Sequence, residues 1–218
     1  ALAFACCVSS CSDFLEEENK TGATAELEYA TVSGIDGLMG SAYSFLRLWA
    51  GKPAALAMNG SGTDDLFYGI DCGMKPLGDY TFTAEQDGKT NFDSYWEAFY
   101  CGIDVCNLAL KYVPLNTAIG EAKKQTYLGE AQFLRAFYYF MLVNHFGAPY
   151  NYDKQALGVP LKLDSNLLPE DQLLMTRNTV EEVYNQIVDD LNEAERLFLT
   201  LSKDKHYEPN YLVSLPMI

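Results

Sequence analysis

One segment in the middle of the chain constrains the fold most strongly. Residues 118–145 follow a helical pattern, and from Phe133 to Val143 apolar side chains occur on nearly every side. A helix that is apolar all round must be covered on several sides. Arg135 and the short apolar length argue against a membrane span, which needs about 20 apolar residues. We therefore expect this helix to lie buried between layers of other helices.

Three further segments, residues 35–49, 93–113 and 179–198, have the one-sided apolar pattern of amphipathic helices. Their apolar positions recur at intervals of three and four residues. In chain order these positions are Ile35, Leu38, Met39, Ala42, Phe45, Leu46 and Trp49, then Trp96, Phe99, Ile103, Cys106, Leu110 and Val113, then Val180, Val183, Tyr184, Ile187, Leu191, Ala194 and Phe198.

Local signals predict where two of these helices begin and where one ends. Ser94 with Glu97, and Thr179 with Glu182, have the spacing of a capping box, in which each side chain bonds the backbone N–H of the other residue. Pro114 is expected to stop the second amphipathic helix.

Two long irregular segments, residues 51–92 and 148–177, separate the predicted helices. The second and third helices are joined by a short turn, so they should form an antiparallel hairpin of the kind that stacks in tetratricopeptide solenoids. The sequence predicts an all-α fold of tetratricopeptide-like helical hairpins with long irregular loops. Loops of this length in a compact domain are usually functional or disordered.

The first residues resemble the end of a bacterial lipoprotein signal. A short apolar run leads to Val8-Ser9-Ser10-Cys11, which fits a lipobox: an apolar residue, two small ones, then the cysteine whose thiol takes the lipid. The alternative is an ordinary apolar strand or helix, because short runs of this kind are ambiguous. Lipid on Cys11 would anchor the protein to a membrane without spanning it.

Charge and cysteine usage exclude several classes of function. The formal net charge is −15, which disfavours binding to nucleic acid or to anionic lipid and suits a neutral ligand or a basic protein.

The cysteines do not form an evident disulfide framework. Cys101 and Cys106 should point in different directions on one helix, and Cys106 should be a core residue. A disulfide between Cys72 and Cys101 is an open alternative. His145 and His206 lack metal-ligand spacing, and no cofactor or catalytic motif is evident.

Four ordered blocks of sequence resemble the SusD/RagB family. They are Trp96-x-x-x-Tyr100-x-x-Ile103-x-x-Cys106-Asn107, then Gly129-Glu130-Ala131-Gln132-Phe133-Leu134-Arg135-Ala136-Phe137-Tyr138-Tyr139-Phe140, then His145-Phe146-Gly147-Ala148-Pro149 with Gly158-Val159-Pro160-Leu161, and last Arg177-Asn178-Thr179-Val180-Glu181-Glu182-Val183-Tyr184 with Asp190-Leu191-Asn192-Glu193-Ala194. The lipobox and the acidic segment after it also belong to this family's leader.

The resemblance implies a glycan-binding lipoprotein on the outer-membrane surface of Bacteroidetes-like bacteria. Such a protein catalyses nothing; it captures an oligosaccharide, or in some relatives a peptide, and delivers it to a SusC-like TonB-dependent transporter. The implied organisation is a signal remnant at 1–10, a lipidated acidic tether at 11–24 and a SusD-like N-terminal helical domain at 25–200. Residues 201–218 depart from the family pattern, and we expect an irregular, truncated C-terminus that leaves an apolar face of the last helix uncovered.

Sugar binding needs flat aromatic faces and planar amide or carboxylate groups, carried on loops and not on apolar stripes. Segment 51–92 supplies such residues, and we favour Asp64, Asp65 and Tyr68, with the alternative that they only shape turns. The full candidate set is Asn59, Asp64, Asp65, Phe67, Tyr68 and Tyr80. Trp49 and Trp96 lie on apolar stripes and should be core. Arg135 should pair with a buried carboxylate or with carbonyls.

Two competing functions stay open beside glycan binding. The first is a helical-repeat adaptor that binds proteins and has no small-molecule ligand; short turns would favour it, and this chain has long ones. The second is a secreted hydrolase that uses Asp64 and Asp65. Adjacent carboxylates in an extended loop point to opposite sides, so they do not form the facing pair that glycoside hydrolysis needs.

Overall fold

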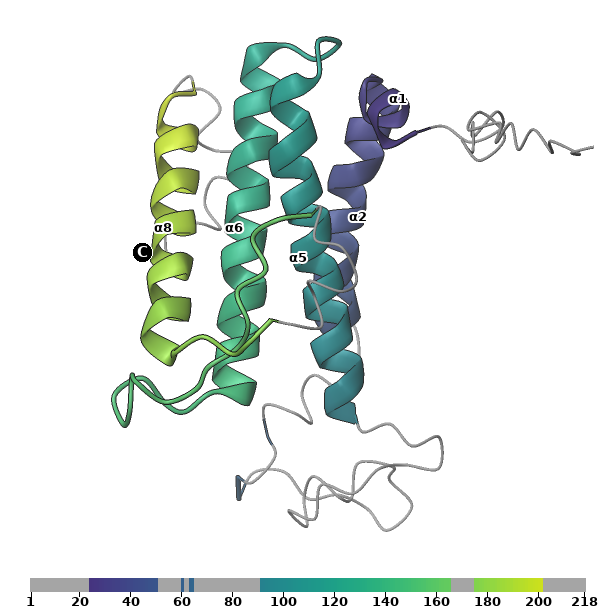
Figure 1. Ribbon diagram of the computed structural model, residues 1–218. Coiled ribbons are helices and arrows are strands. Elements are labelled where there is room, and N and C mark those ends of the chain that lie inside the picture. Colours follow the sequence, from purple (N-terminus) through teal and green to yellow (C-terminus); the bar gives the residue numbers. More distant parts are fainter. Residues whose placement is uncertain (1–23, 51–59, 61–62, 65–90, 166–174, 202–218) are drawn as a thin grey trace, which may run out of the picture.

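The computed structural model describes residues 24–50, 60, 63–64, 91–165 and 175–201. Within these ranges the chain forms five helices: α1 (Ala25–Tyr29), α2 (Val32–Ala50), α5 (Asn91–Leu115), α6 (Glu121–Phe146) and α8 (Val180–Leu199). The four long helices lie side by side in the order α2, α5, α6, α8, each antiparallel to the one before, and α1 crosses one end of α2 (Figure 1). The predicted all-α fold is confirmed.

The central position of α6 explains its all-round apolar sequence. One side packs on α5 and the other on α8, so Tyr138, Tyr139 and Leu142 are all fully buried. Two glycines allow this close packing. A Cβ at Gly102 on α5 would lie 2.7 Å from the Tyr138 ring, and one at Gly129 on α6 would lie 2.6 Å from the Phe198 ring of α8. The predicted burial of the 118–145 segment between helical layers is confirmed.

The start of α8 is the most accurately predicted boundary. Thr179 is the N-cap and forms the complete capping box with Glu182. The Glu182 carboxylate accepts from the Thr179 N–H at 2.8 Å, and this backbone bond, with one from Asn178, lowers the pKa of Glu182. The expected uncovered apolar face is contradicted for the main stripe of α8, which packs on α6 in the described chain, whereas Val188 and Leu199 of the same helix are exposed.

Other boundaries differ from the prediction. The capping box at Ser94 was wrong, because α5 already begins at Asn91 and Ser94 lies inside its first turn. Pro114 lies in the last turn of α5, which ends one residue later. Helix α1 was not predicted: it has five residues and none is buried, so it leaves no apolar stripe to detect.

Asn116 joins the two turns at the α1 end of the bundle. Its side-chain amide donates to the Tyr29 carbonyl at 2.7 Å and to the Thr31 carbonyl at 3.2 Å. Its Oδ1 accepts the N–H groups of Ala118 and Ile119, at 2.8 and 3.0 Å. Asn116 is 2 % exposed, and its one side chain supplies hydrogen-bond partners to backbone groups in both the turn between α1 and α2 and the turn between α5 and α6.

The cysteines behave as expected where they are described. Cys106 is buried in the core, which raises the pKa of its thiol, and Cys101 is exposed on another side of α5. Cys72 lies outside the described residues, so a bridge to it stays a prediction. Among the described residues, none of the helices combines the length and the hydrophobicity that a membrane-spanning segment needs.

Candidate functional site

Both long connections of the chain leave and re-enter the helices at the same end of the bundle. At this end α2 and α6 finish and α5 and α8 begin, which is the lower end in Figure 1. Asp64, the described member of the predicted ligand set, is exposed next to a turn in which Thr63 donates its N–H and hydroxyl to the Gly60 carbonyl, at 3.2 and 2.8 Å. The other members, Asn59, Asp65, Phe67, Tyr68 and Tyr80, lie outside the described residues, as does Cys11, and stay predictions.

Part of the connection from α6 to α8 crosses the helices. Residues 157–163, which we call the strap, run from the lower end along the front of α6 toward α5 (Figure 1). An isolated antiparallel bridge joins Leu157 to Thr179, and the Gly158 N–H donates to the Asn178 carbonyl at 2.7 Å. The strap therefore begins beside the N-terminus of α8.

Side chains of α5 and α6 hold the strap through its backbone. The Tyr100 hydroxyl donates to the Pro160 carbonyl at 2.7 Å. The Tyr139 hydroxyl donates to the Lys162 carbonyl at 2.8 Å and accepts the Lys162 N–H at 2.7 Å. Asn107 donates to the same carbonyl at 2.9 Å, and Asp104 pairs with the Lys162 ammonium at 2.7 Å. Burial raises the pKa of Tyr100 and of Tyr139, so both hydroxyls keep their protons.

A buried ion pair lies beneath the strap and joins three helices. Arg135 of α6 donates from Nε and Nη2 to the two carboxylate oxygens of Asp190 on α8, at 2.8 and 2.6 Å. Its Nη1 donates to the Asn107 Oδ1 of α5 at 2.8 Å, and Gln186 donates to Asp190 at 2.8 Å. Arg135 is 8 % exposed and Asp190 is 2 % exposed. The prediction that Arg135 pairs with a buried carboxylate is confirmed.

Trp96 is not a free platform for a sugar. Its ring packs on Tyr100 at 4.9 Å and edge-on against Phe146 at 5.0 Å, and it lies against the main core. The expectation that it serves packing is confirmed. The side chain of Trp49 lies outside the described ones.

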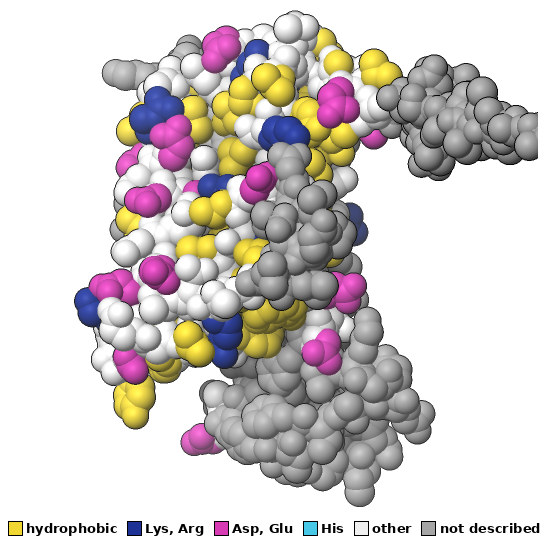
Figure 2. Space-filling model, viewed as in Figure 1, with side chains coloured by type: hydrophobic (Ala, Val, Ile, Leu, Met, Phe, Trp, Pro, Cys, Tyr) yellow, Lys and Arg dark blue, Asp and Glu magenta, His cyan; other side chains and the backbone are white. Residues whose placement is uncertain are grey.

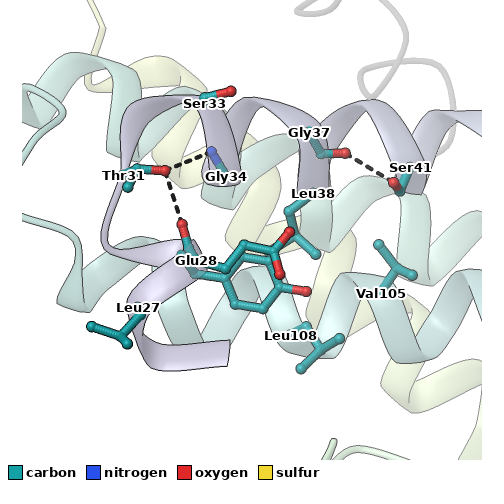
Figure 3. A pocket seen from close by; sticks show the side chains of 11 residues that line it. Leu27, Glu28, Thr31, Ser33, Gly34, Gly37, Leu38, Ser41, Val105 and Leu108 are labelled. Carbon is teal, nitrogen blue, oxygen red and sulfur yellow. Dashed lines mark hydrogen bonds between the residues drawn. The ribbon is translucent and has the colours of Figure 1, made fainter. Parts of the chain in front are cut away.

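A hollow of about 780 Å³ lies between α1, α2 and α5, toward the other end of the bundle (Figure 3). Two of its hydroxyls are bonded to the backbone: Thr31 donates to the Glu28 carbonyl and accepts the Gly34 N–H, and Ser41 donates to the Gly37 carbonyl, each at 2.9 Å. Glu28 is the single charged residue that lines it.

A cluster of exposed residues at the lower end was missed by the sequence analysis. Residues 149–156, which we call the tyrosine turn, lead from α6 toward the strap, and Tyr150 and Tyr152 are both exposed. Hydrophobic side chains lie beside charged ones at the lower left of the molecule (Figure 2). The composition of the turn could have been noticed, since it supplies aromatic, amide and carboxylate groups on a loop.

In the described ranges no group of three His, Cys, Asp or Glu side chains could hold a metal ion.

Comparison with known proteins identifies the family. A family model described as starch-binding and associating with the outer membrane matches residues 75–212. The chain belongs to the SusD-like family. A SusD-like protein from Formosa agariphila is 34% identical over 109 residues, which are 50% of this chain and 19% of that protein. The resemblance found in the sequence blocks is confirmed.

Solved SusD-like structures share the fold. A laminarin-binding SusD-like protein is 26% identical with a TM-score of 0.61, over 76% of this chain and 34% of that one. Surface glycan-binding protein A from Bacteroides uniformis is 26% identical with a TM-score of 0.58, over the same shares. This chain therefore spans about a third of the length of these solved relatives.

Proposed function

We propose that this SusD-like chain binds a neutral glycan as part of a nutrient-uptake system at the outer membrane. The observation that carries the proposal is the match of residues 75–212 to a family described as starch-binding. Two relatives are described as laminarin-binding and as surface glycan-binding. The net charge of −15 is compatible with an uncharged ligand and unfavourable for an anionic one.

The finer part of the proposal is anchoring and delivery. Lipid on Cys11 would tether the protein to the surface through the acidic segment 11–24, with 25–200 as the helical domain. The protein would pass its oligosaccharide to a SusC-like TonB-dependent transporter without changing it chemically. Asn59, Asp64, Asp65, Tyr68 and Tyr80 are the proposed ligand residues in the connection between α2 and α5.

Glycan binding is tested by affinity electrophoresis of the chain from residue 12 onward. Native gels contain starch, laminarin, dextran, xylan or mannan, and the controls are a gel without polysaccharide and a protein that binds none. We expect at least one of these polysaccharides to retard the chain. If a sample shown to be helical by circular dichroism is retarded by none, glycan binding by this chain is contradicted.

Anchoring is tested separately by membrane fractionation. The Cys11→Ser variant, expressed with its full leader in a bacterium that lipidates proteins, should move from the membrane to the soluble fraction. Ser retains the size of Cys but cannot form the thioether to the lipid. The lipoprotein assignment is refuted if Cys11→Ser still sediments with membranes after washing with high salt.

A further inference from the structure

The tyrosine turn, residues 149–156, displays aromatic and polar side chains at the surface. Tyr152 is 86 % exposed and Tyr150 is 38 % exposed. Asn151 and Asp153, beside them, are exposed as well. Flat aromatic faces next to planar amides and carboxylates are the groups that bind pyranose rings and their hydroxyls.

Backbone hydrogen bonds fix the shape of this turn before any ligand arrives. The N–H groups of Tyr152 and Asp153 both donate to the Pro149 carbonyl, at 2.9 and 3.2 Å. The N–H of Gln155 donates to the Asp153 carboxylate at 3.0 Å. A turn that is already ordered loses little conformational freedom on binding, which favours affinity.

Hydrogen bonds from the first turn of α8 hold the C-terminal half of the tyrosine turn. The N–H of Glu181 donates to the Lys154 carbonyl at 2.8 Å, and the N–H of Val180 donates to the Ala156 carbonyl at 2.9 Å. The Glu181 carboxylate also binds the ammonium of Lys154 and the amide of Gln155, which lowers the pKa of Glu181. The charge of Lys154 is thus compensated within the chain.

The Tyr150 ring packs against other aromatic side chains. Its ring meets the Tyr184 ring of α8 edge-on, with centroids 5.1 Å apart. Tyr184 in turn meets Phe140 of α6 at 6.5 Å, and its hydroxyl donates to the Asn144 side chain at 3.3 Å. A continuous set of rings therefore runs from α6 to the surface at Tyr150, while Tyr152 extends beyond it into solvent.

We propose that the tyrosine turn is a glycan-contacting surface, with Tyr152 as a stacking platform for a pyranose ring and Tyr150 as a second one. The inference rests on the proposed function and adds a contact outside segment 51–92. The class of ligand is a neutral oligosaccharide, since the surrounding chain is acidic.

The test compares three variants in the same polysaccharide gels: Tyr152→Ala, Tyr152→Phe, and Leu115→Ala as a matched control. Leu115 is 68 % exposed at the opposite end of α5. Tyr152→Ala should weaken binding on the order of tenfold, as expected for loss of an aromatic anchor. Tyr152→Phe keeps the ring face and should stay within about twofold of the unsubstituted chain, and Leu115→Ala should not change binding, because its side chain is remote from the turn.

The outcomes separate this inference from the function on which it rests. If the unsubstituted chain is retarded and Tyr152→Ala binds equally well, the tyrosine turn is not a glycan contact, although glycan binding stands. If Tyr152→Phe is as weak as Tyr152→Ala, the ring face does not carry the binding and the stacking role is refuted. If the unsubstituted chain is retarded by none of the five polysaccharides, both proposals fail together.

Discussion

The buried pair of Arg135 and Asp190 gives the sharpest prediction about stability. Replacing Arg135 by Met keeps a similar apolar stem but removes four charge-assisted hydrogen bonds, two to Asp190, one to Asn107 and one to Gln132. Asp190, 2 % exposed, would then have the Gln186 amide as its remaining hydrogen-bond donor among the side chains described here. A buried carboxylate without its cation is one of the most costly arrangements in a protein.

The expected loss follows from this geometry. Removing one partner of a buried pair destabilises proteins by about 3–5 kcal/mol. For a chain of this size that corresponds to a fall in Tm of roughly 6–20 °C, since each kcal/mol shifts Tm by roughly 2–4 °C. Replacing both partners in Arg135→Met with Asp190→Leu leaves no unpaired charge, so the double variant should recover most of the loss.

Urea denaturation followed by far-UV circular dichroism measures the free energy of unfolding of each variant. The matched control is Arg196→Met, which breaks the pair of Arg196 with Glu193 at 2.6 Å on the surface of α8. That exposed pair should contribute about 0–1 kcal/mol. The reasoning is refuted if Arg135→Met costs no more than Arg196→Met, or if the double variant is as unstable as Arg135→Met alone.

Three further changes probe the packing, the strap and the capping box. Gly129→Ala should destabilise the chain by about 1–3 kcal/mol, because its Cβ would lie 2.6 Å from the Phe198 ring; an unchanged urea midpoint would show that α6 and α8 are less closely packed. Tyr139→Phe removes the hydroxyl between the N–H and C=O of Lys162 and should speed hydrogen exchange in the strap but not in α8; equal exchange rates would contradict that anchoring role. The pKa of Glu182 is lowered from 4.5 in the folded chain, so its stabilising effect is present above that pH and is lost as the pH falls; Glu182→Gln should flatten the acid side of the stability profile, and parallel profiles would refute this.

The helices were predictable because their burial is periodic. Stripes such as Val180, Val183 and Ile187 recur every three or four residues, and each became the side that packs on the next helix. Helix α1 was missed because it depends on the Thr24 cap and has no buried residue, so it leaves no apolar period. Helix α5 begins at Asn91, two residues before the predicted segment. The partner of Arg135 was expected as a class, but sequence gives no distance between residues 55 positions apart.

The candidate site was predictable only in part. Composition pointed to segment 51–92, and the same criterion applied to residues 149–156 would have selected Tyr150 and Tyr152. Their exposure could not be read from sequence, because a tyrosine near a buried helix end is equally suited to packing, as Tyr138 illustrates. Tyr152 differs from Tyr138 because it lies in a hydrogen-bonded turn that leaves its side chain exposed. This turn also forms hydrogen bonds with the first turn of α8.

Hydrogen exchange with and without bound glycan is the most direct test of where this chain binds its ligand. The chain is compared alone and saturated with the polysaccharide that retards it in gels. We expect slower exchange in the tyrosine turn and the first turn of α8, and unchanged exchange in α1 and the first half of α2. Slower exchange confined to α1 and α2, around the hollow between α1, α2 and α5, would contradict the account.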